Sequence, residues 1–342
     1  MNQEVKNFIK AWWHIFVVIL FGCFAAGFIL FYSISTENWL DWNSTINHKV
    51  NPQTARWLDG MILDRDQTNL KPFAVMLENH IDSRPIAGLE DASLIYEIIV
   101  EGDITRFLAI FDQTVDAKKI GPVRSARPFF VELAEEWNPV YFHAGGSAQA
   151  LTMLKQSPMY NINEISADGI YFWRDKSRTA PHNLFTSADQ VRRAMLGKEI
   201  DLEADFKPWQ FKNDSLEADL SNLVTDIEVS FSSNPYYQVL YQYNEENNDY
   251  TRYLAGKVHK TESGIILKAK NIIVQHVNYK IIDDYGRLIV DLDSGGLAEI
   301  YLDAQMIKGA WKKSDGRTYF YDSLGDEVSF NRGTTWIELV FN

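Results

Sequence analysis

The hydrophobic residues near the start of the chain form one unbroken segment. No Asp, Glu, Lys or Arg occurs from Ala11 to Ser35, and residues 15–32 are apolar apart from two glycines and a terminal tyrosine. A helix of this length crosses a hydrocarbon core of about 30 Å at about 1.5 Å per residue. The pattern therefore predicts a transmembrane signal anchor at residues 11–35.

The flanks of this segment predict its orientation. Two basic residues precede it and two acidic residues follow it, namely Lys6, Lys10, Glu37 and Asp41. The positive-inside rule then places residues 1–10 in the cytoplasm and the rest of the chain outside the cell membrane. Three other interpretations stay open: a cleaved signal peptide, a lipoprotein attached through Cys23, and a buried core helix.

A second pattern begins near Pro72. Residues 36–70 are polar without a sustained period and predict a stalk, whereas short apolar runs then alternate with helical stripes. We expect a mixed α/β domain at residues 71–196. Strands are expected at 73–77, 94–111 with a break at Gly102-Asp103, and 140–142; helices are expected at 128–137, from Ala148, and at 188–195.

Helical periodicity disappears in the last third of the chain. Residues 197–222 are acidic and aperiodic, and we interpret them as a linker. Glycines and polar turns then separate short strands, which we expect at 236–243, 250–254, 271–276 and 280–283. The predicted class is α+β: a transmembrane helix, a mixed α/β domain, and an antiparallel β-rich domain at residues 223–342.

Composition limits the possible partners and chemistry. The chain carries a net charge of −13, and because residues 1–35 contribute +1, the remainder carries −14. Such a surface opposes non-specific binding to nucleic acid, so none is expected as a partner. The one cysteine, Cys23, lies in the apolar segment, so the rest of the chain can form neither disulfides nor cysteine-ligated zinc sites. No cofactor can be assigned, and protein partners are unknown.

Three charged residues flank the expected turn at Gly102-Asp103. A two-residue hairpin loop would pair Ile99 with Arg106 and place Glu97, Glu101 and Arg106 on one face of the sheet. Arg106 bridging the two glutamates would be a structural network. An open site would instead allow Glu97 or Glu101 to act as a general acid or base.

Two arginines lie directly before the helix expected at Pro128. Proline suits the first helical position, so Arg124 and Arg127 should surround the helix N-terminus, where the helix dipole favours acids rather than bases. An anion should therefore balance them. It could be an internal carboxylate, or a phosphate or carboxylate ligand held bidentately.

A third candidate element is His143-Ala144-Gly145-Gly146-Ser147 at a strand-to-helix turn. Gly145 and Gly146 would let backbone N–H groups approach an anion, and Ser147 is expected to cap the helix. His182 and Asn183 belong to another polar loop. His80, His143 and His182 could converge on a metal, but their spacing does not support one, so no metal site is predicted.

Several of these motifs together resemble one family. They are Pro72 to His80, Tyr96-Glu97 with Val100-Glu101-Gly102, Gly121 to Pro128, His143 to Ser147, and Ala180 to Leu184, followed by C-terminal stretches at 269–275, 309–312 and 333–338. They resemble the YerB-like lipoprotein family, domain of unknown function 3048. The resemblance implies a two-domain extracytoplasmic protein of bacteria, mostly Gram-positive ones, and implies no established activity.

The resulting functional expectation is a cell-envelope binding or accessory module. Its partners would be the membrane, through the N-terminal helix, and an anionic envelope polymer or peptide. The expected ligand-binding residues are Arg106, Arg124, Arg127, Gly145, Gly146, Ser147 and Asn183. Two alternatives remain: an envelope hydrolase, with catalytic Glu97, Glu101, His143 and His182, and a structural or protein-interaction module.

Overall fold

The computed structural model describes residues 54–63, 69–214 and 223–342. The expected tail, the expected anchor at 11–35 and the first part of the expected stalk lie outside these residues. Among the described residues, no helix is both long and apolar enough to span a membrane. Within the expected stalk, β1 (Thr54–Ala55) and β2 (Ile62–Leu63) form an antiparallel hairpin whose turn buries Leu58 and Asp59.

Eleven strands form one large sheet. Ten of them follow one path, and β17 (Leu288–Asp291) pairs with β16 beside it. The order along the path is β20 (Arg317–Tyr321), β19 (Gln305–Ser314), β18 (Gly296–Leu302), β16 (Asn271–Ile281), β22 (Thr335–Phe341), β4 (Leu94–Val100), β5 (Ile104–Phe111), β3 (Phe73–Glu78), β6 (Val140–His143) and β7 (Asn161–Asn163).

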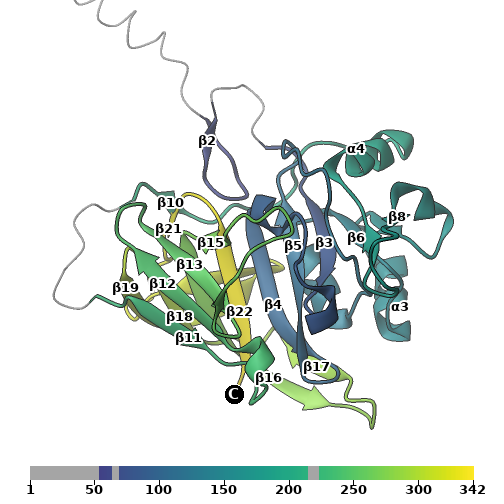
Figure 1. Ribbon diagram of the computed structural model, residues 1–342. Helices are drawn as coiled ribbons and strands as arrows, with labels where there is room; N and C mark the ends of the chain where they lie inside the picture. The colour runs from purple at the N-terminus through teal and green to yellow at the C-terminus, as the bar shows by residue number, and fades with distance from the viewer. Residues whose placement is uncertain (1–53, 64–68, 215–222) are drawn as a thin grey trace, which may run out of the picture. The chain divides into compact units, whose positions relative to one another are not determined.

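The last strand joins the two halves of the chain. β22 pairs in parallel with both β16 and β4, so strands from before residue 200 and after residue 223 belong to the same sheet (Figure 1). The expectation of a purely antiparallel C-terminal region is therefore wrong at this strand. Six of its seven residues are buried, as is typical of a central strand covered on both faces.

The remaining strands form smaller sheets. The first is a five-stranded sheet of β11 (Asp226–Val229), β12 (Val239–Asn244), β13 (Asp249–Leu254), β14 (Lys257–Val258) and β15 (Lys268–Ala269). The others pair β8 (Trp173–Arg174) with β9 (Leu184–Phe185) and β10 (Phe211–Lys212) with β21 (Phe330–Asn331). The strands expected at 271–276 and 280–283 belong largely to one strand, β16.

Both faces of the large sheet are covered. Helices α2 (Pro128–Glu135) and α3 (Ala148–Gln156) pack on one face. Helix α4 (Ala188–Gly197) and the five-stranded sheet pack on the other. Single turns of 3-10 helix occur at η1 (Ile81–Ser83), η2 (Leu89–Asp91), η3 (Ala167–Tyr171) and η5 (Pro235–Tyr237).

Local helix signals are confirmed. Pro128 occupies the first turn of α2 after an extended Arg127, and the Ser147 side chain caps α3 by accepting a hydrogen bond from the Ala150 N–H. The expected linker, by contrast, contains Trp209, which is 4% exposed and packs against Trp137 and Phe330. A single buried tryptophan in so short a segment produces no periodic pattern of hydrophobic residues, so the sequence did not indicate this packing.

The predicted register of the β4–β5 hairpin is wrong by one residue. Val100 pairs with Ile104 and Ile98 pairs with Arg106, so the loop contains three residues, 101–103, rather than two. A shift of one residue moves each side chain of a strand to the other face. Arg106 therefore lies on the face opposite Glu97.

Candidate functional site

Glu97 lies at the centre of a closed polar network. Its side chain is fully buried between the large sheet and the five-stranded sheet, and it forms an ion pair with the equally buried Arg252 of β13. Its other oxygen accepts hydrogen bonds from Thr105 and, at 3.1 Å, from Asn79. With these donors in place, Glu97 is closed off from solvent.

The rest of this network comes from the C-terminal half. Glu338 of β22 lies directly beside Glu97 and receives a hydrogen bond from the Tyr241 hydroxyl. Burial and the neighbouring Glu97 raise the pKa of Glu338 to about 8. Burial and Arg252 lower the pKa of His259 well below its ordinary value, so that imidazole is neutral and can accept from Arg252.

The opposite face of the hairpin carries a cluster of arginines. Arg106 is 6% exposed and donates to the Ser125 carbonyl at 2.8 Å. Among the described residues, no carboxylate lies within ion-pair distance of Arg106, whereas Arg124 pairs with Glu78 at 2.8 Å. Burial and the nearby Arg127 lower the pKa of Arg106 to about 10. The internal carboxylates expected for Arg124 and Arg127 are therefore present as Glu78 and Glu101, whereas the structure does not show Arg106 bridging Glu97 and Glu101.

Arg127 reaches an open cleft beside this cluster. It pairs with Glu101 at 2.5 Å, and each of the two side chains is about one-fifth exposed. The cleft has a volume of about 550 Å³. It is lined by Glu101, Ser125, Arg127, Gly146, Ser147, Tyr285 and Arg287. Four of these residues, Glu101, Arg127, Gly146 and Ser147, were predicted from the sequence.

Arg287 and Tyr285 were missed by the sequence analysis. They belong to the turn between β16 and β17, where Arg287 pairs with Asp283 and remains 46% exposed. Arg287 lies 160 residues after Arg127, so no local spacing links the two. The one local signal is Gly286, a turn residue with a φ of 75°.

The glycine turn, residues 145–147, lies against the cleft, but one of its backbone N–H groups already has a hydrogen-bond partner. Gly145 adopts a φ of 66°, a backbone conformation that favours glycine. Its N–H donates to Asn163 at 2.9 Å and is not free for a ligand. Gly146 and Ser147 are the members of the turn that line the cleft.

The remaining predicted residues lie elsewhere. His143 is fully buried, its Nδ1 is 2.7 Å from the Gly145 carbonyl, and burial lowers its pKa. Asn183 contacts Arg174 at 3.1 Å within its own loop. His182 binds Glu78 at 2.9 Å and stacks on His80. The structure thus brings His80 and His182 together without His143.

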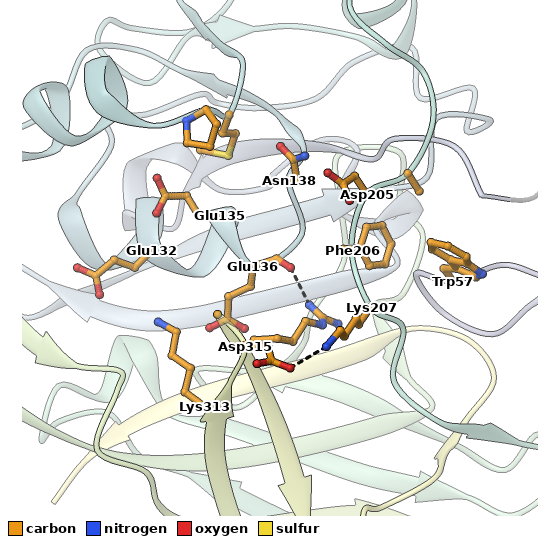
Figure 2. Close-up of a pocket in the computed structure, with 15 residues that line it drawn as sticks. Trp57, Glu132, Glu135, Glu136, Asn138, Asp205, Phe206, Lys207, Lys313 and Asp315 are labelled. Atoms are coloured by element: carbon orange, nitrogen blue, oxygen red, sulfur yellow. Dashed lines mark hydrogen bonds and ion pairs between the residues drawn. The ribbon is translucent and has the colours of Figure 1, made fainter.

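A larger cavity lies on the α2 side of the sheet (Figure 2). Its volume is about 720 Å³, and its lining includes five carboxylates and three cationic side chains. They are Glu132, Glu135, Glu136, Asp205, Asp315, Lys207, Lys313 and Arg317. The excess of acidic side chains disfavours an anionic ligand in this cavity. The glutamates within residues 132–136 were the sequence signal that could have pointed to it.

Comparison with family models identifies the chain. The model for the "Protein of unknown function (DUF3048) N-terminal domain" matches residues 58–201, and the C-terminal domain model of the same family matches residues 227–337. The chain belongs to the DUF3048 family. The resemblance read from the sequence motifs is thereby confirmed.

One relative extends this result both in sequence and in structure. The chain is 32% identical to the "Putative lipoprotein YerB" of Bacillus subtilis over 295 residues, covering 84% of this chain and 88% of the relative. The crystal structure of YerB from Bacillus subtilis matches with a TM-score of 0.76 at 32% identity, covering 84% of this chain and 96% of that one. The mixed, sheet-rich fold is therefore shared with a solved DUF3048 structure.

Both DUF3048 regions contribute to the cleft. Glu101, Arg127 and Ser147 come from the N-terminal matched region, whereas Tyr285 and Arg287 come from the C-terminal one. Both regions also supply the closed network, because Glu97 belongs to the first and Arg252 to the second. The DUF3048 halves thus meet at one closed and one open polar site.

Proposed function

We propose that this DUF3048 protein is a membrane-anchored module of the cell envelope that binds an anionic group of a wall polymer or peptide. The anchoring part is supported by the apolar segment at 11–35 and by the lipoprotein name of the Bacillus subtilis relative. Protease treatment of intact cells tests the placement. The body should be degraded while cytoplasmic proteins survive, and full protection of the body would refute it.

The anion site is supported chiefly by the unpaired charge of Arg106. Its buried guanidinium donates to the Ser125 carbonyl and lies near Arg127, and both Ser125 and Arg127 line the cleft. A buried charge without an ionic partner is costly, and its arginine neighbours raise that cost. An anion in the cleft would offset this repulsion while taking direct hydrogen bonds from Arg127.

The geometry of the cleft suits a phosphate or carboxylate group. Arg127 and Arg287 each have one carboxylate partner and remain partly exposed, so both can turn toward a ligand. Guanidinium groups bind such planar or tetrahedral anions through paired hydrogen bonds. The first turn of α3, capped by Ser147, adds backbone N–H groups at the same place.

Calorimetry with two chemically different probes tests the site. We expect either a poly(glycerol phosphate) fragment or a peptide ending in D-alanyl-D-alanine to bind the wild-type body. Arg127→Gln should weaken binding about tenfold to hundredfold, since a hydrogen bond to a charged group is worth about 1.5–3 kcal/mol. Arg193→Gln, at an exposed arginine of α4, is the matched control and should change nothing. Unchanged binding in Arg127→Gln would remove the cleft from the proposal.

The hydrolase alternative would depend on Glu101 and His182. Glu97 and His143, the other two candidates, have no exposed surface. Glu101 lines the cleft, whereas His182 binds Glu78 on the far side of Arg124. Because this arrangement shows no shared acid–base pair, binding is the function that the geometry supports better.

A further inference from the structure

A separate group of side chains lies at the end of β3. His80 caps the 3-10 turn η1, Asp82 lies within that turn, and His182 approaches from the loop before β9. Each offers one ligand atom, and these three atoms lie within 4.8 Å of one another. Segments separated by about 100 residues thus bring two imidazoles and a carboxylate to one point.

The two imidazole rings have a spacing that suits a shared ion. Their centres are 5.1 Å apart, and their planes differ by 16°. Two imidazoles bound to one tetrahedral zinc ion at about 2.0–2.1 Å have ring centres about 5 Å apart. Because the planes are nearly parallel, one ring must turn before both in-plane lone pairs can point at the same ion, and the His80 side chain, which is 33% exposed, can make this turn.

A buried carboxylate orients His182. The Nδ1 atom of His182 lies 2.9 Å from Glu78, whose side chain is 2% exposed and also pairs with Arg124. If Nδ1 carries the proton and donates it to Glu78, the lone pair of Nε2 is available to a cation. Metal-binding histidines almost always have such a carboxylate or carbonyl behind them.

The other two side chains are free to adjust. The Asp82 side chain is 70% exposed, and the His80 side chain is 33% exposed. The Asp82 N–H donates to His80 Nδ1 at 3.2 Å, a long bond that coordination through this atom would replace. The arrangement is open to solvent, so water would complete the coordination shell.

We propose that His80, Asp82 and His182 bind a divalent transition-metal ion, with Glu78 holding His182 in the binding tautomer. Two imidazoles and one carboxylate favour zinc or its neighbours over magnesium or calcium, which prefer oxygen ligands. This metal site lies outside the Arg127 cleft and does not depend on the anion-binding proposal.

Titration of the untagged, chelator-treated full-length protein with Zn²⁺ and Co²⁺ tests the proposal. We expect one ion per chain by calorimetry, and visible absorption bands from bound Co²⁺. Asp82→Asn, at an exposed position, should weaken Zn²⁺ binding about tenfold or more, and His80→Ala/His182→Ala should abolish both signals. His276→Ala removes a histidine on β16 outside the group and should leave both signals intact.

A further variant separates orientation from ligation. Glu78→Gln keeps all three ligands but removes the orienting charge, so affinity should fall about 10- to 100-fold with the stoichiometry unchanged. Circular dichroism of each variant confirms that the fold is retained. Failure of the wild type to bind one Zn²⁺, or equal binding by the His80→Ala/His182→Ala variant, would overturn the metal site.

Discussion

The two faces of the β4–β5 hairpin hold their charges in different ways. On one face, Glu97 is fully buried and bound by Arg252, Asn79 and Thr105. On the other, Arg106 is buried without an ionic partner among the residues that the structure describes, and Arg127 beside it pairs with Glu101 at the edge of a cleft. The first arrangement satisfies its own charges, whereas the second leaves positive charge available to a ligand.

The difference assigns separate roles to the two polar sites. A buried ion pair whose members come from both DUF3048 regions couples the halves of the fold, because neither charge can stay buried alone. A partly exposed pair adds little to stability and can exchange its partner for an anion. We therefore propose that the Glu97 network contributes to stability and that the Arg127 cleft contributes to binding.

The largest effect should follow from breaking the closed network. Arg252→Met leaves Glu97 buried without its cation, and we expect a loss of about 3–5 kcal/mol in the free energy of unfolding. Urea unfolding followed by tryptophan fluorescence measures it. Adding Glu97→Gln should recover part of the loss, because the uncompensated charge is then gone. A loss below about 1 kcal/mol in Arg252→Met would show that the network is not a stability element.

An intermediate effect is expected from the pH dependence of Glu338. Its pKa rises from an ordinary 4.5 to about 8 in the folded protein. The folded state then binds the extra proton, so the stabilising contribution is complete below about pH 4.5 and is lost as pH rises to about 8. Glu338→Gln, which imitates the protonated acid, should flatten this slope.

The control for this prediction is an exposed glutamate on the second sheet. Glu228→Gln on β11 should leave the slope of unfolding free energy against pH as it is in the wild type. Urea unfolding at several pH values between 4.5 and 8 provides the comparison. A slope that survives in Glu338→Gln would assign the pH dependence to other groups.

Local patterns predicted much of the secondary structure but not the hairpin register. The periodicity at 128–137 and 188–195 corresponds to α2 and α4, because packing against a sheet requires an apolar stripe. Gly102 and Asp103 both have positive φ, which suits a two-residue turn as well as the observed three-residue loop. The sequence therefore does not distinguish the two loop lengths, although the loop length decides on which face of the hairpin Arg106 lies.

Contacts between residues far apart in the sequence were the part of the candidate sites that local patterns could not predict. Arg252 lies 155 residues after Glu97, and Arg287 reaches the cleft from a turn far from the Gly121 to Pro128 motif. The patterns predicted that Arg124 and Arg127 need anions, because a helix N-terminus disfavours bases. These two arginines pair with Glu78 and Glu101 of the same half. Glu97 instead pairs with Arg252 across the two halves that β22 joins, and no local pattern indicated that contact.

The smallest effect should come from the open face. Arg127→Gln, the variant expected to lose anion binding, should change the free energy of unfolding by about 1 kcal/mol or less, because a partly exposed ion pair gains little over solvated charges. The same urea experiment, with Arg193→Gln as the reference, measures it. A loss as large as that of Arg252→Met would mean that Arg127 also belongs to a closed network. In that case the Glu101–Arg127 pair would be a stability element like the Glu97 network, and the distinction between the two faces of the hairpin would fail.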